Sequence, residues 1–512
     1  MINKFITAFF SLFILSCSDP QPDNEYGNEQ FSKELRELKD YFQIPGMAVL
    51  VKKGDQTLYE DHLGFADLKK DLRMDSTITI PMASLTKIFT STLIWMLVEE
   101  GKVSLEDMVS DYARGYQIPD SIRIEHVLSH TSQGNLGKNF YYNNSRFMLL
   151  GQIIETASGK SFKSNVYEKI ISPLGLKNTY LLEDTIQVAS ENRKIASPYF
   201  LDGKTTDGIK GKKITEGFID YGYSAVAGIA STVHDIAKLG ASIADNRLLA
   251  KSSVDKMFSP YQTGLPYGLG IFTQELMGEK LVWGYGQYDC YSSLLLLVPD
   301  QELVFVIAAN NDLLSNPARL IAGDITYSLF ALSFLKNFVF DVGQMPLFEN
   351  SMSIREVGKR IDRTNGGFYL KKLLAQSVTA TFMAQFDTQE IEVSREILQQ
   401  VFDLYPNYNN YGDLVLMHHL NMLKSMNTKR DKKEFVEFDR PFTGIGDSLL
   451  RVDPFNPYAN YYMANYYQIK GISDSTSYYF SQVVNAQNFT SWWYTKEAER
   501  WIKENEKEAT GK

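Results

Sequence analysis

The spacing of apolar residues near the start of the chain predicts one helix followed by two strands. Over residues 31–43 apolar side chains recur at helical spacing, at Phe31, Leu35, Leu38 and Phe42. Residues 46–54 begin with an uninterrupted apolar run and end in a turn, which is typical of a strand. A second short strand is expected at residues 57–59.

Apolar runs of strand length return in the second half of the chain. They cover residues 269–273, 281–283, 292–298 and 303–309. A helical pattern over residues 317–338 follows them. Strands at both ends with helices between predict an α+β fold over residues 31–340. In it, both ends complete an antiparallel sheet flanked by helices, and a helical subdomain occupies about residues 85–220.

After about residue 340 the pattern is helical throughout. Helices are predicted at residues 368–386, 388–404, 413–424, 458–470, 476–486 and 492–504. Large, small, aromatic and glycine residues recur with a fixed spacing at Met463-Ala464, Tyr467, Gly471, Phe480 and Val483. Residues 457–490 thereby resemble one tetratricopeptide repeat, and an earlier repeat looks to end at Asp453-Pro454. About three such units are normally needed for a continuous core. The resemblance implies an all-α, tetratricopeptide-like domain over residues 341–512 that can bind a protein partner.

The composition fits a globular protein of two domains. The 512 residues are 44% apolar and 22% charged, which is ample for globular cores. The net charge is −9 and no basic cluster stands out, so nucleic acid is not an expected partner. None of the six histidines has a second metal ligand at a suitable spacing. Neither a metal nor another cofactor is expected.

The chain begins with a positive charge, a short apolar run and a cysteine. Lys4 is followed by an apolar run over residues 5–15, which is too short to span a bilayer as a mature anchor, and then by Ser16-Cys17. These residues resemble a bacterial lipoprotein signal. The resemblance implies a signal peptide at residues 1–16, lipid on Cys17 and a linker at residues 17–30. An ordinary secretory signal with an incidental cysteine is the alternative. We expect a protein of the bacterial cell envelope, held to the membrane by the lipid alone.

Ser84 and Lys87 form the pattern with the clearest chemistry. They stand in Ser84-Leu85-Thr86-Lys87, where a turn marked by Pro81 enters an apolar helix. Residues three apart on a helix share a face, so Lys87 lies one turn from Ser84. A serine hydroxyl needs a base to become a nucleophile, and a desolvated lysine can lose its charge and supply one. Free N–H groups at a helix start also suit a developing oxyanion.

Further segments follow this serine in a fixed order. Tyr142, but not Tyr141, lies nine residues before Gly151 of a Leu-Leu-Gly helix. Together with Ser84-x-x-Lys87 they resemble the serine β-lactamase and penicillin-binding-protein family, in its class C β-lactamase and D-Ala-D-Ala carboxypeptidase-like branch. Other segments fit the family pattern across roughly residues 31–338: Ser104-Leu105-Glu106-Asp107, Val127-Leu128-Ser129-His130-Thr131-Ser132, Pro173-Leu174-Gly175-Leu176-Lys177-Asn178-Thr179 and Ala227-Gly228-Ile229-Ala230-Ser231-Thr232.

The resemblance implies a role for each matching residue. Ser84 is the nucleophile, and Lys87 and Tyr142 share the acid–base work; which of the two is the microscopic base stays open. Asn144 is expected to bond the substrate amide or the Lys87 side chain. Backbone N–H groups of Ser84 and of residues 288–289 are expected to form the oxyanion hole.

The third motif of the family is altered in this chain. The family has a lysine or histidine there, before a serine-rich strand, and that group holds a substrate carboxylate. Here the segment is Val282-Trp283-Gly284-Tyr285-Gly286-Gln287, and the first motif position is Gly284 or Tyr285. We expect Tyr285 and Gly286 to contact the substrate without supplying charge, so that neutral esters are better substrates than penicillins.

These residues predict an exported serine hydrolase that forms an acyl-enzyme with an ester or a D-amino-acid-containing amide. One alternative is a catalytically weak or inactive penicillin-binding-like protein, which binds cell-wall fragments and recruits a partner through its helical domain. A second alternative is a β-lactamase. The intact residues Ser84, Lys87 and Tyr142 favour the enzyme, and the altered third motif favours the binding protein.

Overall fold

The computed structural model describes most of the chain. The described residues are 25–116, 118–183, 194–203, 213–342, 345–347, 366–387, 389–404, 413–427, 439–486 and 493–510. The signal peptide expected at residues 1–16, Cys17 and residues 17–24 lie outside them, so the lipid anchor remains a prediction. No helix in the described ranges is long and apolar enough to cross a lipid bilayer.

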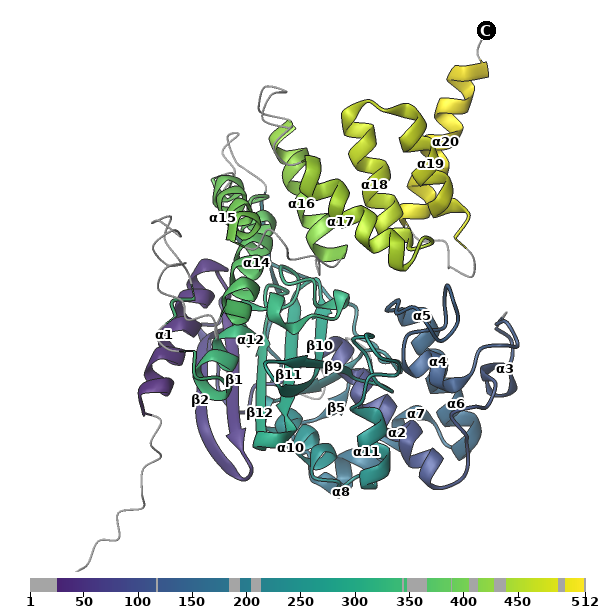
Figure 1. Ribbon diagram of the computed structural model, residues 1–512. Coiled ribbons are helices and arrows are strands. Elements are labelled where there is room, and N and C mark those ends of the chain that lie inside the picture. The colour runs from purple at the N-terminus through teal and green to yellow at the C-terminus, as the bar shows by residue number, and fades with distance from the viewer. Residues whose placement is uncertain are drawn as a thin grey trace, which may run out of the picture.

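A seven-stranded antiparallel sheet forms the centre of the first domain (Figure 1). The strand order is β3-β2-β1-β12-β11-β10-β9. The strands are β1 (Gly46–Lys53), β2 (Gln56–Asp67), β3 (Leu72–Arg73), β9 (Phe272–Leu276), β10 (Glu279–Tyr288), β11 (Tyr291–Val298) and β12 (Leu303–Ala309). β1 pairs with β12 from Met47 opposite Ala309 to Lys53 opposite Leu303. Segments from both ends of the domain thus complete one sheet, as the sequence predicts.

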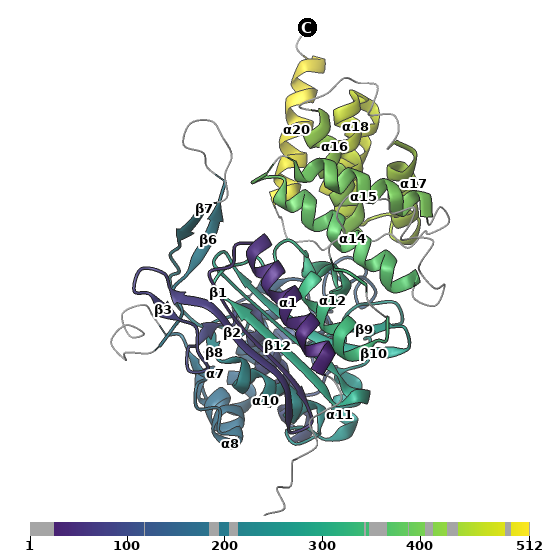
Figure 2. The same cartoon turned by 90° about the vertical axis from the view of Figure 1, so that its left-hand side faces the viewer.

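Both faces of the sheet are buried, which explains the continuous apolar runs in the strands. In β1, Val49 and Val51 belong to a core on one face, and Leu50 between them belongs to a core on the other. Helix α1 (Glu25–Tyr41) lies across the first face, as Figure 2 shows, and includes the last six residues of the expected linker. Helices α2 (Thr86–Glu99) and α10 (Val233–Ala244) contribute to the second core. A strand buried on both faces need not alternate apolar and polar residues.

Two strands are longer than the sequence pattern predicts. β2 covers residues 56–67 rather than 57–59, because it pairs with β1 although most of its side chains are only half-buried. β10 continues to Tyr288 by pairing with β11. The hydrogen bonds between paired strands set both lengths. The pattern of apolar residues in the sequence does not show where these hydrogen bonds end.

A subdomain of short helices surrounds α2. It consists of α3 (Val109–Tyr112), α4 (Ile124–Leu128), α5 (Asn144–Phe147), α6 (Leu149–Ser158), α7 (Phe162–Val166), the π-helical turn η2 (Tyr167–Ile171) and α8 (Ser172–Leu174). A small sheet of β4 (Ile80–Pro81), β8 (Ile229–Ser231) and β5 (Tyr180–Leu181) lies beside it. β6 (Tyr199–Asp202) pairs with β7 (Lys213–Glu216), and α11 (Lys251–Met257) precedes β9.

The helix predicted over residues 317–338 is broken in its first half. That half holds two 3-10 turns, η4 (Leu320–Ala322) and η5 (Ile325–Tyr327); α12 (Leu329–Phe334) and the π-helical turn η6 (Leu335–Val339) follow. Gly323 has a φ of 87°, a left-handed conformation that ends η4. Asp324 and Ser328 then accept backbone N–H groups at the starts of η5 and α12. The sequence pattern was wrong here because it did not weigh these stop and cap residues.

The C-terminal part is helical, as predicted. Its helices are α14 (Gly366–Met383), α15 (Glu390–Leu404), α16 (Asp413–Asn427), α17 (Asp439–Val452), α18 (Pro457–Lys470), α19 (Ser473–Val484) and α20 (Trp493–Thr510). The sequence pattern did not predict α17. Consecutive helices pack in pairs, α14 with α15 and α18 with α19. The tetratricopeptide-like character of this region stays a prediction.

The helical region contacts the first domain at several separate points. Lys371 of α14 pairs with Asp324 at 2.6 Å. The Tyr41 hydroxyl of α1 donates to the Glu390 carboxylate of α15 at 3.0 Å. A third point is Asp453, between α17 and α18, which lies against the loop before α5.

Candidate active site

Ser84 stands where the chain leaves β4 and enters α2. It belongs to the 3-10 turn η1 (Ala83–Leu85), and α2 begins at the next residue, Thr86. Ala83 and Leu85 are buried, whereas Ser84 between them is partly exposed. A serine in this position is held by a buried turn and can still meet a substrate.

A close contact with the sheet fixes the turn that carries Ser84. The Ser293 hydroxyl of β11 donates to the carbonyl oxygen of Met82 at 2.9 Å. A Cβ on Gly286 of β10 would lie 1.9 Å from the same oxygen, so only glycine fits there. Gly286, which the sequence analysis assigns to substrate binding, therefore also sets the distance between η1 and β10.

Lys87 is buried one helical turn after Ser84. Its Nζ lies 2.8 Å from Ser84 Oγ and 3.3 Å from the carbonyl oxygen of Val226. The ring centroids of Tyr142 and Phe147 lie 4.9 and 5.8 Å from this nitrogen. No carboxylate of the described residues forms an ion pair with it, and burial lowers the pKa of Lys87 well below its usual value. The surroundings favour a neutral amine beside the serine.

Tyr142 reaches Ser84 from the loop before α5. Its side chain lies close enough to Ser84 for the serine hydroxyl to affect the tyrosine's pKa. Burial raises the pKa of Tyr142 well above its usual value, and the nearby Ser84 hydroxyl opposes this rise only in part. Tyr142 therefore keeps its proton and can donate it. The Tyr141 hydroxyl donates to Asp453 instead. The structure thus places Tyr142, the tyrosine that the spacing to Gly151 selects, beside Ser84 and Lys87.

His130 supports the ring of Tyr142. The two rings stack with centroids 4.3 Å apart, and His130 Nδ1 accepts the backbone N–H of Asn143 at 3.1 Å. Burial lowers the pKa of His130 well below its usual value. The imidazole is thus a neutral platform under the tyrosine, and it orders the loop on which Tyr142 stands.

Asn144 lies apart from this group. It is exposed at the first residue of α5, while its neighbour Asn143 is buried, caps α5 and donates to Gln133 at 2.5 Å. Lys87 bonds Ser84 and Val226, so the Lys87 contact considered for Asn144 is not present. Exposure leaves Asn144 able to meet a substrate amide.

Tyr285, and not Gly284, is the residue of the third motif that lies beside Tyr142. The two tyrosine rings have centroids 6.2 Å apart. Gly284 instead lies against α2, where an added Cβ would be 2.9 Å from Ile88. Burial raises the pKa of Tyr285 well above its usual value, and the charge of Arg319 opposes that rise. The charge of Arg319, an exposed residue of a different segment, therefore acts on Tyr285.

The edge of β10 beside the site has no strand partner in the described part of the chain. β9 pairs with β10 only from Glu279 to Trp283, and residues 284–288 pair with β11 alone. Such an edge can hydrogen-bond an extended substrate backbone. Residues 288–289, expected in the oxyanion hole, lie at its end and are at least partly exposed.

Sequence reasoning missed groups that reach the site from distant segments. Val226 supplies a carbonyl to Lys87, Arg319 lies near Tyr285, and Asp453 of the helical region bonds Tyr141. The family segment at residues 227–232 lies directly after Val226 and could have pointed to it. No pattern pointed to Asp453. The described residues contain no group of His, Cys, Asp and Glu side chains that could hold a metal ion, and Cys290 is a buried free thiol.

Comparisons with known proteins match the first domain to one family and to a solved fold. Residues 31–323 match the family model described as Beta-lactamase. Penicillin-binding protein 4* of Bacillus subtilis is 22% identical, over 70% of this chain and 85% of its own length. Unguisins hydrolase ungD' of Aspergillus campestris is 25% identical, over 57% of this chain and 63% of its own length. The octameric penicillin-binding protein homologue from Pyrococcus abyssi superposes with a TM-score of 0.51 at 22% identity, over 55% of this chain and 73% of the homologue, and shares the fold.

Proposed function

The chain belongs to the beta-lactamase family and is a serine hydrolase of it, and we propose that it forms an acyl-enzyme on Ser84 with an ester or a D-amino-acid-containing amide. The observation that carries the proposal is the distance of 2.8 Å between Lys87 Nζ and Ser84 Oγ. Burial without a neighbouring carboxylate favours the neutral amine, which has the free electron pair that a general base needs.

Lys87 acts as the base and Tyr142 as the acid in the first step. As Ser84 Oγ bonds to the substrate carbonyl carbon, its proton passes to Lys87. Tyr142 gives its proton to the leaving group as the bond to that group breaks, and it recovers a proton from Lys87. The raised pKa of Tyr142 and the lowered pKa of Lys87 both support these directions of transfer.

Water completes the cycle along the same proton path in reverse. The water oxygen bonds to the acyl carbon and loses a proton to the pair of Tyr142 and Lys87. Ser84 Oγ then leaves the acyl carbon and takes a proton back, so the acid product is released and the enzyme is restored. Backbone N–H groups of Ser84 and residues 288–289 stabilise the oxyanion in both steps. Tyr142→Phe should lower kcat/KM by a factor on the order of 10²–10⁴.

Ser84→Ala tests the nucleophile, and Ser145→Ala is its matched control. Ser145 is an exposed serine of α5 close to Tyr142 in sequence, and no catalytic role is assigned to it. Ser84→Ala should lower ester hydrolysis by on the order of 10⁴ or more and abolish labelling by a fluorophosphonate, while Ser145→Ala keeps both. Undiminished hydrolysis in folded Ser84→Ala would sink the mechanism.

The alternative function is a penicillin-binding-like protein that binds cell-wall fragments without turnover. The uncharged Tyr285 at the third motif is the observation that favours it. Intact-mass detection of an acyl adduct separates the two functions, because only an active serine is acylated. The panel should contain neutral esters, D-amino-acid peptides and penicillins.

The third motif supports a preference for substrates without a carboxylate. Losing a charge-assisted hydrogen bond costs about 1.5–3 kcal/mol, which is roughly ten- to a hundredfold in binding. Tyr285→His should therefore raise activity toward a penicillin and leave a neutral aryl ester almost unaffected. Arg319→Ala is the second arm, because its charge lies near Tyr285. Efficient penicillin hydrolysis by the wild type that Arg319→Ala removes would favour the β-lactamase alternative, with Arg319 as the substituted cation.

Residues 1–17 resemble a lipoprotein signal, and this resemblance supports the proposal of a place in the bacterial cell envelope, with lipid on Cys17 as the only membrane attachment. Cys17→Ala should move the protein from the membrane fraction to the soluble or unprocessed fraction. Cys290→Ala is the matched control, since Cys290 is buried and should not change the location. Wild-type protein in the soluble fraction, with no lipid on Cys17, would reject the anchor. The helical region is proposed to bind a protein partner.

A further inference from the structure

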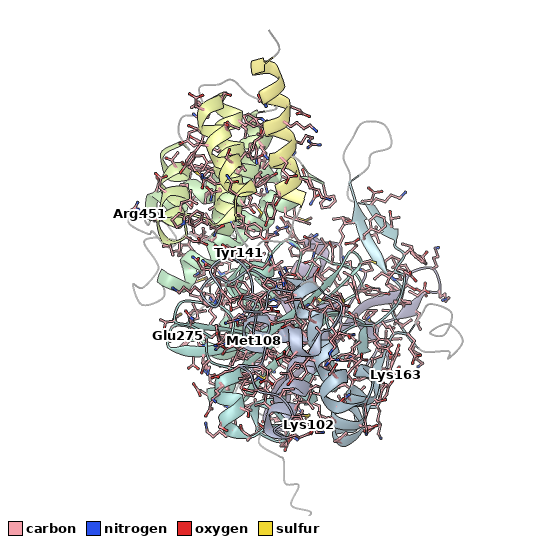
Figure 3. All side chains as sticks on the ribbon, turned by 90° about the vertical axis from the view of Figure 1, so that its right-hand side faces the viewer. Lys102, Met108, Tyr141, Lys163, Glu275 and Arg451 are labelled. Carbon is pink, nitrogen blue, oxygen red and sulfur yellow. The ribbon has the colours of Figure 1, made fainter. Side chains whose placement is uncertain are left out.

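The helical region contacts the loop that carries Tyr142. Asp453 Oδ2 accepts a hydrogen bond from Asn139 Nδ2 at 2.8 Å and another from the Tyr141 hydroxyl at 2.7 Å. The ring of Tyr141 also stacks on that of Tyr458 of α18, with centroids 6.2 Å apart and planes 25° apart. Figure 3 shows Tyr141 at the junction between the two domains. Two donors of one loop thus converge on a carboxylate oxygen that lies 314 and 312 residues away from them in sequence.

The two oxygens of Asp453 have separate tasks. Oδ1 accepts the backbone N–H of Phe455 at 3.2 Å and shapes the turn between α17 and α18. Oδ2 makes the contacts with the first domain. The Asp453 side chain is 9% exposed, so its hydrogen bonds are largely shielded from water. Charge-assisted bonds in such a setting are shorter and stronger than neutral ones.

The loop is held on both sides of Tyr142. On one side, the backbone N–H of Tyr141 donates to the carbonyl oxygen of His130 at 2.8 Å. On the other side, the backbone N–H of Asn143 donates to His130 Nδ1 at 3.1 Å. The first domain thus holds the backbone of Tyr141, and the hydroxyl and ring of Tyr141 contact the helical region.

We propose that Asp453 is a positioning residue for Tyr142, so that the helical region completes the active site of the first domain. Tyr142 must stay close to Ser84 and to the leaving group to transfer a proton, and a displacement of about 1 Å can cost on the order of a hundredfold in rate. Asp453 holds Tyr141, and Tyr141 holds the adjacent tyrosine in place. The proposal rests on the proposed function, because it concerns the proton donor of that reaction.

Other contacts between the domains allow this role to be separated from simple attachment. The bond from Tyr41 to Glu390 joins the domains away from the loop. Glu390→Gln weakens the attachment without touching the loop. Tyr112→Phe removes a tyrosine hydroxyl that bonds Asp107 at 2.7 Å within the first domain, and it is the matched control for Tyr141→Phe.

The experiment measures kcat and KM for a neutral ester in Asp453→Ala, Tyr141→Phe and the two controls. Asp453→Ala should lower kcat by about tenfold to a hundredfold, with a smaller change in KM, and Tyr141→Phe should do the same to a lesser extent. Both controls should keep the wild-type kcat. If Asp453→Ala does not fold, the milder Tyr141→Phe, which leaves the turn at Phe455 intact, decides the question.

Amide hydrogen exchange gives a readout that does not depend on catalysis. Exchange over residues 139–147 should be faster in Asp453→Ala and Tyr141→Phe and unchanged in Glu390→Gln and Tyr112→Phe. Wild-type kcat and exchange in both loop variants would overturn the proposal. A fall in kcat equal to that of Glu390→Gln would also overturn it, because attachment alone would then explain the effect. Hydrolysis that survives Ser84→Ala would instead overturn the proposed function and leave the exchange result standing.

Discussion

Lys87 and Lys336 are both buried lysines of the first domain. They differ in whether a carboxylate forms an ion pair with the ammonium group. Lys336, on η6, forms an ion pair with Glu34 of α1, and its Nζ also donates to the carbonyl oxygen of Met345 at 2.8 Å. Glu34 accepts further hydrogen bonds from Ser333 at 2.6 Å and from the nearby Asn337 at 3.0 Å. Lys87 has a serine hydroxyl, a carbonyl and aromatic rings around it.

The difference separates a structural lysine from a reactive one. Removing an ammonium from water is costly, and a buried carboxylate with its own hydrogen bonds can offset that cost. At Lys336 the carboxylate of Glu34 forms an ion pair with the ammonium. At Lys87 no carboxylate among the described residues does so, and burial favours the neutral amine that the proposed mechanism needs as its base. Burial by itself therefore does not indicate function; burial without a counter-charge, beside a nucleophile, does.

Substitution by arginine should give the largest difference between the two lysines. Lys87→Arg should lower kcat/KM by on the order of 10²–10⁴, because a guanidinium is effectively never deprotonated. Lys336→Arg keeps a cation beside Glu34 and should leave kcat/KM per folded molecule close to that of the wild type. Steady-state kinetics on a neutral ester checks both. Near-wild-type activity in Lys87→Arg would remove the distinction between the two sites.

Replacement by methionine should separate the sites in stability. Lys336→Met leaves Glu34 buried without its cation and should lower the free energy of unfolding by about 3–5 kcal/mol. Lys87→Met leaves no charge behind and loses two hydrogen bonds, so the free energy of unfolding should fall by less, about 1–3 kcal/mol.

Urea unfolding of the wild type and both methionine variants provides the measurement. In Lys336→Met, adding Glu34→Gln should restore part of the lost stability, since the unpaired charge is then gone. Equal destabilisation by the two methionine substitutions would contradict the comparison.

The pH dependence of kcat/KM should show one acid limb from Lys87. A lysine is charged below its pKa and neutral above it, and burial moves the pKa of Lys87 well below its usual value. As the pH falls through that pKa, the base is lost and kcat/KM should fall about tenfold per pH unit. Tyr142 has a raised pKa and His130 a lowered one, so both keep their neutral form at and above neutral pH. Lys336→Arg should give the same profile, whereas a flat profile down to acidic pH would argue against Lys87 as the base.

Much of the candidate site follows from local spacing in the sequence. Ser84 and Lys87 are one helical turn apart, and this relation needs only the geometry of a helix. The spacing to Gly151 selected Tyr142, which lies beside Ser84 and Lys87, over its neighbour Tyr141. The apolar runs of β1 and β12 likewise predicted the strands that close the sheet.

Other features depend on segments that only the folded chain brings together. The carbonyl of Val226 and the rings of Tyr142 and Phe147 surround the Lys87 amine and shield it from water. None of these residues is near Lys87 in sequence. The pairing of β10 turns Tyr285 toward Tyr142 and Gly284 toward α2. The bond from Tyr141 to Asp453 spans 312 residues.

The sequence by itself therefore determined the fold class and most of the elements, and it placed Ser84 and Lys87 one helical turn apart. The tertiary structure decided which lysine is desolvated, which residue of the third motif lies beside the site and which distant group holds the catalytic loop. The physical reason is range. Helix and strand periodicity are set by neighbours along the chain, whereas burial and electrostatics at a site are sums over every segment that packs around it.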